Sequence, residues 1–336
     1  ASEAFSTTQY DCLMQLKAWG VPVSTLVQRC DSIKACQAYY QSMLAQREDL
    51  PFEIDGVVLK CDAFEVQQAL GHSKRAPKWA IAYKFPAKQV PTRVQSIRFQ
   101  TGRTGAITPV AVVDPVFVGG VMVRHASLHN MDLLRQKDIR ESDLVLLHRA
   151  GDVIPEIVSV VLAERPKDAV PVILPESCSA CGSSLVQSEA MVVWTCPAQW
   201  TCPAQIRGRF VHFISRSAMN IAGLGPQLID SLLEHQLVSD VSDLYRLTSA
   251  QLLSLPRMGE KSVDNILMAI RHSKEQVTLP RLIYALGMPH VGLATAELLA
   301  RHYGHLSALR SAQATDLEQI PDIGPQMATS IAASVR

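Results

Sequence analysis

The chain has 336 residues, of which 48% are hydrophobic and 19% are charged, and its formal net charge is +1. This composition excludes an intrinsically disordered chain, and the length allows about two to four domains. The most apolar window, 104–123, contains Pro109, Asp114 and Pro115, so it predicts short strands rather than a membrane helix. No charged-then-apolar leader follows the first residue, which is Ala. We therefore expect a soluble, intracellular chain without a signal peptide, cut from a longer protein.

The first part of the chain has the pattern of helices. Apolar residues recur at three- and four-residue spacing over 10–19 and 33–44. Residues 51–88 read as strands, and 89–165 holds many short β-like runs separated by Gly and Pro, which indicates a small barrel. From Phe210 onward the pattern is that of short helices separated by glycine.

Two of the expected strands carry lysines. One reads Glu-Ile-Asp-Gly-Val-Val-Leu-Lys and ends at Lys60, and the other reads Trp-Ala-Ile-Ala-Tyr-Lys-Phe and contains Lys84. Alternation puts Lys84 on the face opposite the large side chains, beside two alanines that leave room for a ligand. Asp55 and Lys60 fall on opposite faces of a regular strand, so Gly56 or a bulge must adjust the backbone if they share a site. The alternative is two ordinary strands with edge lysines.

Acidic residues are absent from two stretches, 66–113 and 190–229. We interpret these stretches as surfaces that meet phosphates, although a chance fluctuation or a solvated face is the alternative. Their cationic residues are Lys74, Arg75, Lys78, Lys84, Lys88, Arg93, Arg98 and Arg103 in the first stretch, and Arg207, Arg209 and Arg216 in the second.

Four cysteines have the spacing of a metal site. Cys178 and Cys181 form a Cys-x2-Cys pair, and after 14 residues Cys196 and Cys202 form a Cys-x5-Cys pair. Such pairs close a tetrahedral zinc site and stabilise a segment too small to build its own core. The alternatives are two disulfides or a redox pair. Disulfides do not suit an intracellular chain that has further scattered cysteines, which we expect to be buried, inert thiols: Cys12, Cys30, Cys36 and Cys61.

A glycine-containing turn recurs at roughly 30-residue spacing in the last part of the chain, which is the pattern of repeated helix-hairpin-helix units. The turns are Asn220-Ile221-Ala222-Gly223-Leu224-Gly225, Leu255-Pro256-Arg257-Met258-Gly259, Met288-Pro289-His290-Val291-Gly292 and Ile320-Pro321-Asp322-Ile323-Gly324. Backbone N–H groups at such turns bind anions and grip a nucleic-acid backbone without reading bases. One such turn is weak support, but four in succession favour this function. The first turn is no dinucleotide fingerprint, because it follows no strand and Leu228 replaces the third glycine.

These residues together resemble bacterial NAD-dependent DNA ligase over essentially the whole chain. The runs 53–60 and 79–86 resemble the two late nucleotidyltransferase motifs of that family. The runs 99–109, 126–130 and 149–155 are similar to segments of its OB-fold. The cysteines and the hairpins then follow in the family's order.

The resemblance implies a multidomain α+β chain. Its expected parts are the C-terminal part of an adenylation (nucleotidyltransferase) domain over 1–88, an OB-fold β-barrel over 89–170, a four-cysteine zinc finger over 171–208, and an all-α helix-hairpin-helix DNA-binding domain over 209–336.

The implied activity is the sealing of nicks between a 5′-phosphate and a 3′-hydroxyl in duplex DNA, during replication and repair. A lysine attacks NAD and forms lysyl-AMP, the AMP passes to the 5′-phosphate, and the 3′-hydroxyl displaces AMP. The implied cofactors are NAD, Mg²⁺ (or Mn²⁺) and Zn²⁺. The implied setting is a monomer on nicked double-stranded DNA in the bacterial cytoplasm, at the nucleoid, without a membrane.

The resemblance also assigns residue roles. Lys60 and Lys84 would bind the phosphate and adenylate part of NAD, and Asp55 would help to place Mg²⁺ or orient the nucleotide. The expected DNA-binding residues are Arg103, Arg149, Arg207, Arg209, Gly223, Gly225, Gly259, Gly292 and Gly324.

One departure from the family pattern is large. The family's nucleophile lies in Lys-x-Asp-Gly, but the only Asp-Gly here is Asp55-Gly56, and position 53 is Glu. The family's domain for the nicotinamide half and its BRCT domain are also not in this sequence. We therefore expect the chain to be inactive by itself. The alternatives are a non-catalytic DNA-binding module, which has no need of Asp55, Lys60 and Lys84, and an ATP-dependent ligase or capping enzyme.

Overall fold

A computed structural model describes residues 6–73, 76–150, 154–187 and 193–335. Lys74 and Arg75 of the first basic stretch, 151–153 of one OB-fold motif, and 190–192 of the second acid-free stretch lie outside the described residues. The chain forms two compact units. The first comprises 1–98, 110–128 and 135–172, and the second comprises 99–109, 129–134 and 173–336.

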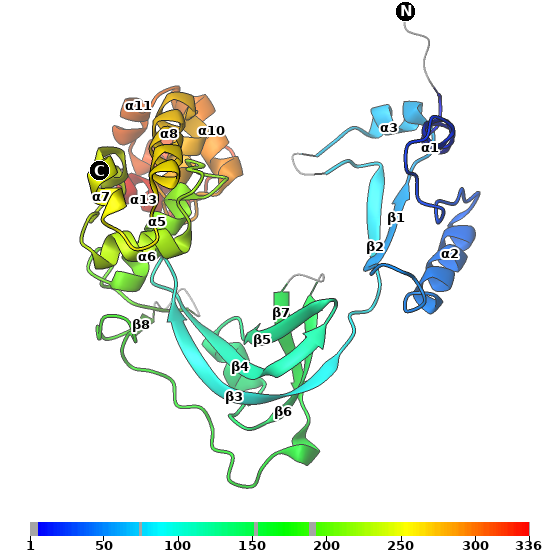
Figure 1. The fold of residues 1–336 in the computed structure, drawn as a ribbon, viewed down its shortest axis with the longest axis horizontal. Coiled ribbons are helices and arrows are strands. Elements are labelled where there is room, and N and C mark those ends of the chain that lie inside the picture. The colour runs from blue at the N-terminus through cyan, green and yellow to red at the C-terminus, as the bar shows by residue number, and fades with distance from the viewer. Residues whose placement is uncertain (1–5, 74–75, 151–153, 188–192, 336) are drawn as a thin grey trace, which may run out of the picture. The chain divides into compact units, whose positions relative to one another are not determined.

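The N-terminal part of the first unit combines three helices with a two-stranded sheet (Figure 1). Helices α1 (Gln9–Ala18) and α2 (Ile33–Ala45) confirm the two expected helices, and each begins after a hydroxyl side chain that caps its first turn. Strands β1 (Gly56–Lys60) and β2 (Ala80–Lys84) are antiparallel.

The prediction of strands over 51–88 is wrong for one segment, Phe64–Leu70, which forms the helix α3. Its sequence, Phe-Glu-Val-Gln-Gln-Ala-Leu, consists mainly of good helix formers. Gly71 then ends the helix, because its φ of 65° favours glycine.

The expected barrel is confirmed as a closed sheet with the strand order β3-β4-β5-β7-β6. Its strands are β3 (Val90–Thr101), β4 (Ile107–Val118), β5 (Val121–Ser127), β6 (Leu144–Ala150) and β7 (Ile154–Val160). The first two strands have 12 residues each, longer than the short runs that the prolines suggested. Strand β4 contains both Pro109 and Pro115. Its pairing with β5 shifts register between Val112 and Val116, so the strand accommodates Pro115 at an irregularity. A short helix, α4 (Met131–Gln136), follows β5, and a 3-10 turn, η1 (Leu162–Glu164), follows β7.

The second unit contains the cysteine module and the helices. Strands β8 (Val186–Gln187) and β9 (Trp194–Thr195) form a small hairpin. Helix α5 (Pro203–Ile214) begins directly after Cys202, earlier than the expected start at Phe210, because Pro203 is well suited to the first turn of a helix. The later helical elements are α6 (Pro226–Glu234), η2 (Val241–Arg246), α7 (Ser249–Leu253), α8 (Glu260–Gln276), α9 (Leu279–Ala285), α10 (Leu293–Tyr303), α11 (Leu306–Arg310), α12 (Ala314–Leu317) and α13 (Pro325–Ser334).

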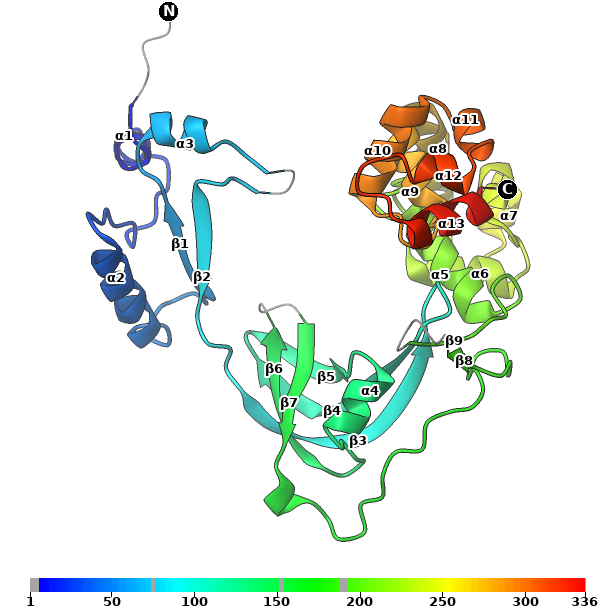
Figure 2. The ribbon, with the colours of Figure 1, turned by 180° about the vertical axis from the view of Figure 1, so that it is seen from behind.

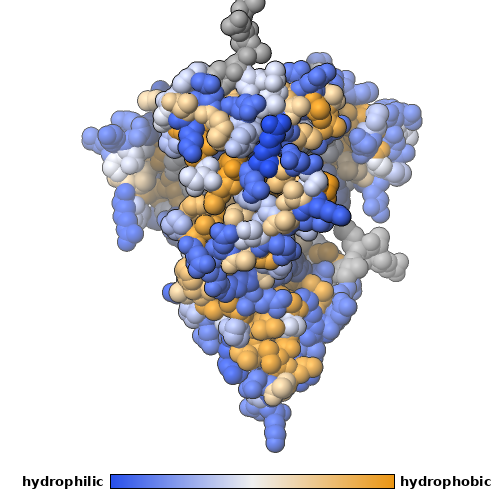
Figure 3. Space-filling view, turned by 90° about the vertical axis from the view of Figure 1, so that its right-hand side faces the viewer, coloured by the Kyte–Doolittle hydropathy of each residue, from blue (hydrophilic) through white to orange (hydrophobic). Residues whose placement is uncertain are grey.

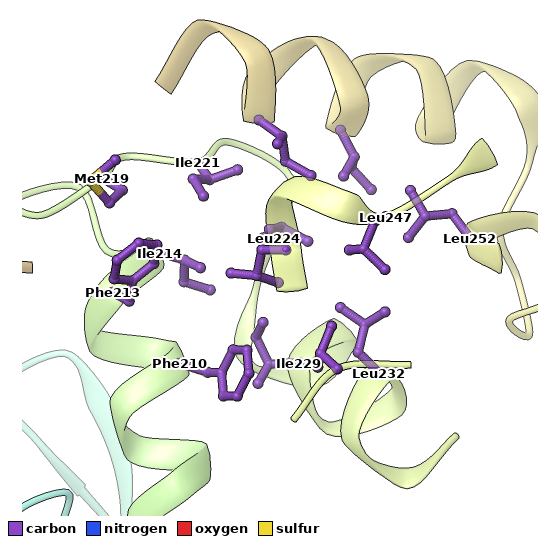
Figure 4. Close-up of a cluster of buried hydrophobic side chains, with 14 of the residues drawn as sticks. Phe210, Phe213, Ile214, Met219, Ile221, Leu224, Ile229, Leu232, Leu247 and Leu252 are labelled. Atoms are coloured by element: carbon purple, nitrogen blue, oxygen red, sulfur yellow. The ribbon is translucent and has the colours of Figure 1, made fainter. Parts of the chain in front are cut away.

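Two hydrophobic clusters hold the helices together. In the first, Phe210 and Ile214 of α5 meet Ile229 and Leu232 of α6 beneath the long helix α8 (Figure 4). The second joins α9 through α13 around Leu299 (Figure 2). The four hairpins therefore fold as two successive pairs, each with its own core.

Polar and apolar residues are mixed on the surface of the protein. In Figure 3, hydrophobic residues interrupt the hydrophilic surface in several places. Exposed apolar side chains include Val58 and Ile81 of the two-stranded sheet and Phe117 of the barrel. Within the described ranges, we find no helix that has both the length and the apolar character of a membrane span.

Candidate metal centre and nucleic-acid interface

The four clustered cysteines lie close enough to bind one metal ion. The Sγ atoms of Cys181 and Cys196 are 3.5 Å apart, those of Cys178 and Cys202 are 4.0 Å apart, and all four lie within 4.8 Å of one another. Tetrahedral zinc with Zn–S bonds of about 2.3 Å places its sulfurs about 3.8 Å apart, whereas a disulfide needs about 2.05 Å. The cluster therefore fits a zinc finger and excludes the two-disulfide alternative.

The surroundings of the cluster favour a structural rather than a catalytic metal site. Cys178, Cys196 and Cys202 are at most 2% exposed. Burial alone would raise the pKa of the Cys178 thiol, but hydrogen bonds from the Thr101 hydroxyl and the backbone lower that pKa to about 6. Burial raises the pKa of Cys196 to about 12. A closed set of four protein ligands leaves no position for a substrate.

The tip of the β3–β4 hairpin packs directly on this cysteine module. The Thr101 hydroxyl lies 3.2 Å from Sγ of Cys178, and the Cys196 amide donates to the Gly105 carbonyl at 2.9 Å. A Cβ atom at Gly105 would lie 2.6 Å from the Cys196 carbonyl oxygen. Gln205 of α5 donates to that same carbonyl at 3.0 Å. The sequence analysis missed Thr101, because nothing in the local pattern links it to a cysteine 77 residues away.

The lysine-bearing strands bring only part of the expected site together. Gly56 pairs with Lys84 and Lys60 pairs with Ala80, so both lysines project from one face but from opposite ends of the two-stranded sheet. Lys84 forms an ion pair with Asp55, which precedes β1. A Cβ at Gly56 would lie 2.8 Å from Cα of Lys84, so glycine allows the strands to close here.

Lys60 belongs to a different part of the surface. It lines a cavity of about 650 Å³ together with Asp62 and residues of α1 and α2. Tyr40 of α2 stacks on Tyr83 at 4.0 Å between ring centroids, on the face of the sheet away from the lysines. Within the described parts of the chain, the only group of three or more His, Cys, Asp or Glu side chains placed to bind one metal is the cysteine cluster. A Mg²⁺ ion at Asp55 would therefore depend on phosphate and water ligands.

Three of the four predicted DNA-binding arginines donate hydrogen bonds within the protein. Nη1 of Arg103 donates to the Gly287 carbonyl at 2.9 Å. Arg149 donates to the carbonyl of Gly119. Nη2 of Arg207 donates to Oδ2 of Asp230 at 2.9 Å, and Nε of Arg207 donates to Oδ1 of the same carboxylate.

Arg209 packs against an aromatic ring that sequence reasoning did not single out. Its guanidinium carbon lies 3.5 Å from the ring centroid of Trp200. The Trp200 side chain is nevertheless 68% exposed. Burial lowers the pKa of Arg209 below its ordinary value. Arg209 therefore supports an exposed indole, which is a surface suited to stacking on a base or sugar.

The hairpin glycines occupy matching places. Gly225, Gly259, Gly292 and Gly324 are the N-cap residues of α6, α8, α10 and α13. A Cβ atom at any of these four glycines would have no neighbour within 4 Å. Each helix therefore begins at an open turn whose N–H groups can reach an anion.

Comparison with known proteins agrees with this arrangement. The family model for the NAD-dependent DNA ligase adenylation domain matches 1–88, and the model for the NAD-dependent DNA ligase OB-fold domain matches 91–169. A SAM-like helix-hairpin-helix tandem matches 215–272, and a helix-hairpin-helix motif matches 281–334. The chain belongs to the NAD-dependent DNA ligase family.

Curated relatives of this ligase-family chain are named DNA ligase. The protein from Marinobacter nauticus is 47% identical over 96% of this chain and 48% of its own length. The protein from Nitrosococcus oceani is 48% identical over 97% of this chain and 48% of its own length. One from Coxiella burnetii is 45% identical over 98% of this chain and 49% of its own length. The chain spans about half the length of the curated relatives that it matches.

Proposed function

We propose that this chain is the part of an NAD-dependent DNA ligase that holds the nick and contributes the late adenylation motifs. The observation that carries the proposal is the succession of the Asp55–Lys84 strand pair, a closed barrel, a four-cysteine cluster and four open helix N-termini. A pure DNA-binding module would need the last three features but not the first. The proposed setting is a monomer on nicked duplex DNA in the bacterial cytoplasm, at the nucleoid.

Lys84 and Lys60 are proposed to hold phosphates of NAD or of the adenylated DNA end. Lys84 is held by Asp55, and half of its side chain is exposed, so a phosphate can approach it. Lys60 lies at a cavity large enough for part of a nucleotide. NAD, when bound, supplies the adenylyl group, and the lysines stabilise the negative charge that develops on the transferred phosphate.

The cysteine cluster is proposed to hold one zinc ion. Zinc would hold the β3–β4 hairpin and the start of α5 in one arrangement. Cys178 contacts Thr101 of the hairpin, and Cys202 is the N-cap residue of α5. We also propose that the adenylation part, the OB-fold and the zinc finger end at residues 88, 170 and 208.

The DNA-binding part of the proposal predicts a steep dependence on salt. The 336-residue chain should bind nicked duplexes of unrelated sequence equally well in a gel-shift titration, because backbone contacts carry no sequence information. For about six phosphate contacts, affinity should fall roughly 10³-fold between about 50 and 200 mM salt. Binding confined to one sequence, or unchanged by salt, would refute a backbone grip.

The chain of 336 residues should form no covalent adduct with adenine-labelled NAD. The expected reason is that the sequence contains no Lys-x-Asp-Gly, the motif that holds the family's nucleophilic lysine: its only Asp-Gly is Asp55-Gly56, and position 53 is Glu. Labelled protein would be separated in a denaturing gel, with a full-length NAD-dependent ligase as the positive control. A labelled band from this chain would show that another residue accepts AMP.

A further inference from the structure

A cavity lies beside the exposed indole of Trp200 in the second unit. It has a volume of about 370 Å³, and residues of α5, η2 and the end of α9 line it together with Arg103 and Trp200. Concave sites of roughly 300–1,000 Å³ are the usual binding places of small ligands. The two strand lysines and the N-cap glycines of the hairpins, all of which the structure describes, do not line it. The functions proposed above therefore leave this cavity unassigned.

The inner side of the cavity is apolar and held in place by hydrogen bonding. Phe213 and Ala285 line it and are buried. Nε2 of His212 donates to the Tyr284 carbonyl at 2.8 Å, which holds the imidazole against α9. Burial lowers the pKa of His212, so its ring is neutral near pH 7 and adds no charge to the cavity. Such an inner wall suits a flat ring better than a solvated ion.

The outer side of the cavity is open and carries an excess of positive charge. Trp200, Asp240 and Ser242 line it and are exposed. Of the described residues that line the cavity, Arg103 and Arg209 are cationic and Asp240 alone is anionic. Oδ1 of Asp240 already accepts from the Ser242 amide at 2.9 Å. The charge that remains favours a ligand that is itself negative.

Arg209 has a donor nitrogen that the protein does not satisfy. Its guanidinium group lies over the Trp200 ring, and its Nη1 atom is buried. Within the described part of the chain, no atom accepts a hydrogen bond from this nitrogen. A buried donor without an acceptor is costly, so a ligand that brings an oxygen beside Nη1 gains affinity. A phosphate oxygen or the carbonyl oxygen of a base would supply that acceptor.

We propose that this cavity binds one unpaired nucleotide of a DNA strand. The base stacks on the pair formed by Trp200 and Arg209, and an oxygen of the nucleotide accepts from Nη1 of Arg209. Aromatic rings and guanidinium planes are the surfaces on which proteins stack unpaired bases, whereas a paired base must first leave the duplex. A small anion would leave the indole unused, and an apolar ligand would leave the arginine unsatisfied. The site goes beyond the proposed function, because it requires neither a nick nor the hairpins.

Binding of thymidine 5′-monophosphate to the whole 336-residue chain, followed by saturation-transfer NMR of the ligand, tests the site. Thymine avoids an adenylate site at the strand lysines. We expect half-saturation at about 1 mM or below. The base-free analogue 2-deoxyribose 5-phosphate should bind at least about fivefold more weakly, because it cannot stack. No saturable binding of the nucleotide, or equal binding of the two ligands, would overturn the proposal.

Substitution of the indole locates the bound nucleotide. Trp200→Leu should weaken the binding of thymidine 5′-monophosphate at least about fivefold, and Trp200→Phe should bind more tightly than Trp200→Leu because it keeps a ring. Trp19→Leu is the matched control, because Trp19 is 64% exposed against 68% for Trp200 and does not line the cavity. Equal affinity of the leucine and phenylalanine variants at position 200, or an equal loss in Trp19→Leu, would overturn the proposal.

A charge at the outer side of the cavity gives an independent measurement. Ser242 is exposed, so Ser242→Glu should fold, and Ser242→Gln is its neutral control of similar size. Repulsion of the phosphate should make Ser242→Glu bind at least about threefold more weakly than Ser242→Gln at low salt. Equal affinity of this pair would place the nucleotide elsewhere and overturn the proposal. Because the ligand contains no duplex, that outcome leaves nick binding untouched, and a failure of nick binding would leave this site standing.

Discussion

Cys196→Ser should abolish the zinc binding that we propose for the cysteine cluster, and should disorder the segment between the barrel and the helices. Cys196 is 1% exposed, and its sulfur lies 3.5 Å from that of Cys181. A serine hydroxyl is a poor zinc ligand, and the free energy of binding of a structural zinc, of order 10 kcal/mol, stabilises the folded module directly. The β3–β4 hairpin tip and the start of α5 should loosen together, because both are bonded to this module.

Metal analysis of the purified chain should find about one zinc per molecule in the original and much less in the variant. DNA affinity should fall with it, and the thermal transition should broaden or move to lower temperature. Cys61→Ser is the matched control, because Cys61 is only half-buried and lies outside the cluster. A Cys196→Ser protein with full zinc content would show that the cluster is not the zinc site.

Gly208→Ala should destabilise the second unit despite the higher helix propensity of alanine. An added Cβ would lie 2.9 Å from Cα of Arg103 and 3.2 Å from its backbone nitrogen, so the clash involves main-chain atoms that no rotamer change removes. Overpacking of this kind costs about 1–3 kcal/mol, and the gain in helix propensity offsets up to about 1 kcal/mol. The hydrogen bond from Arg103 to Gly287 should weaken as the hairpin tip is pushed away.

Thermal unfolding followed by circular dichroism would measure this effect, with an expected decrease in Tm of a few degrees. Gly225→Ala is the control, because its Cβ has open space, and it should change the free energy of unfolding by less than about 1 kcal/mol. Arg103→Ala separates the guanidinium contact from the backbone packing: it should cost about 1 kcal/mol, as for one hydrogen bond. An unchanged Tm in Gly208→Ala would mean that the hairpin tip is not packed on α5.

Local patterns were sufficient where the chemistry is local. The cysteine spacing predicted that the four thiols lie together, because two pairs of nearby thiols can close around one ion. The repeated glycine turns predicted four hairpins because the same backbone requirement recurs at a regular spacing along the chain. Helices α1 and α2 followed from apolar periodicity. The pattern failed at α3, where a short run of helix formers lies between two strands, and at β4, which continues through Pro109 and Pro115 as one strand of 12 residues.

Tertiary structure decided which partners those residues meet. The sequence determined that Asp55, Lys60 and Lys84 lie on or beside two strands, but only the strand register joins Asp55 to Lys84 and separates Lys60 from both. The sequence also determined that Arg103, Arg207 and Arg209 carry positive charge, but only the fold determined which group each of them contacts. Periodicity and spacing specify contacts over a few residues, whereas side-chain pairing across a sheet or between modules depends on how the whole chain closes.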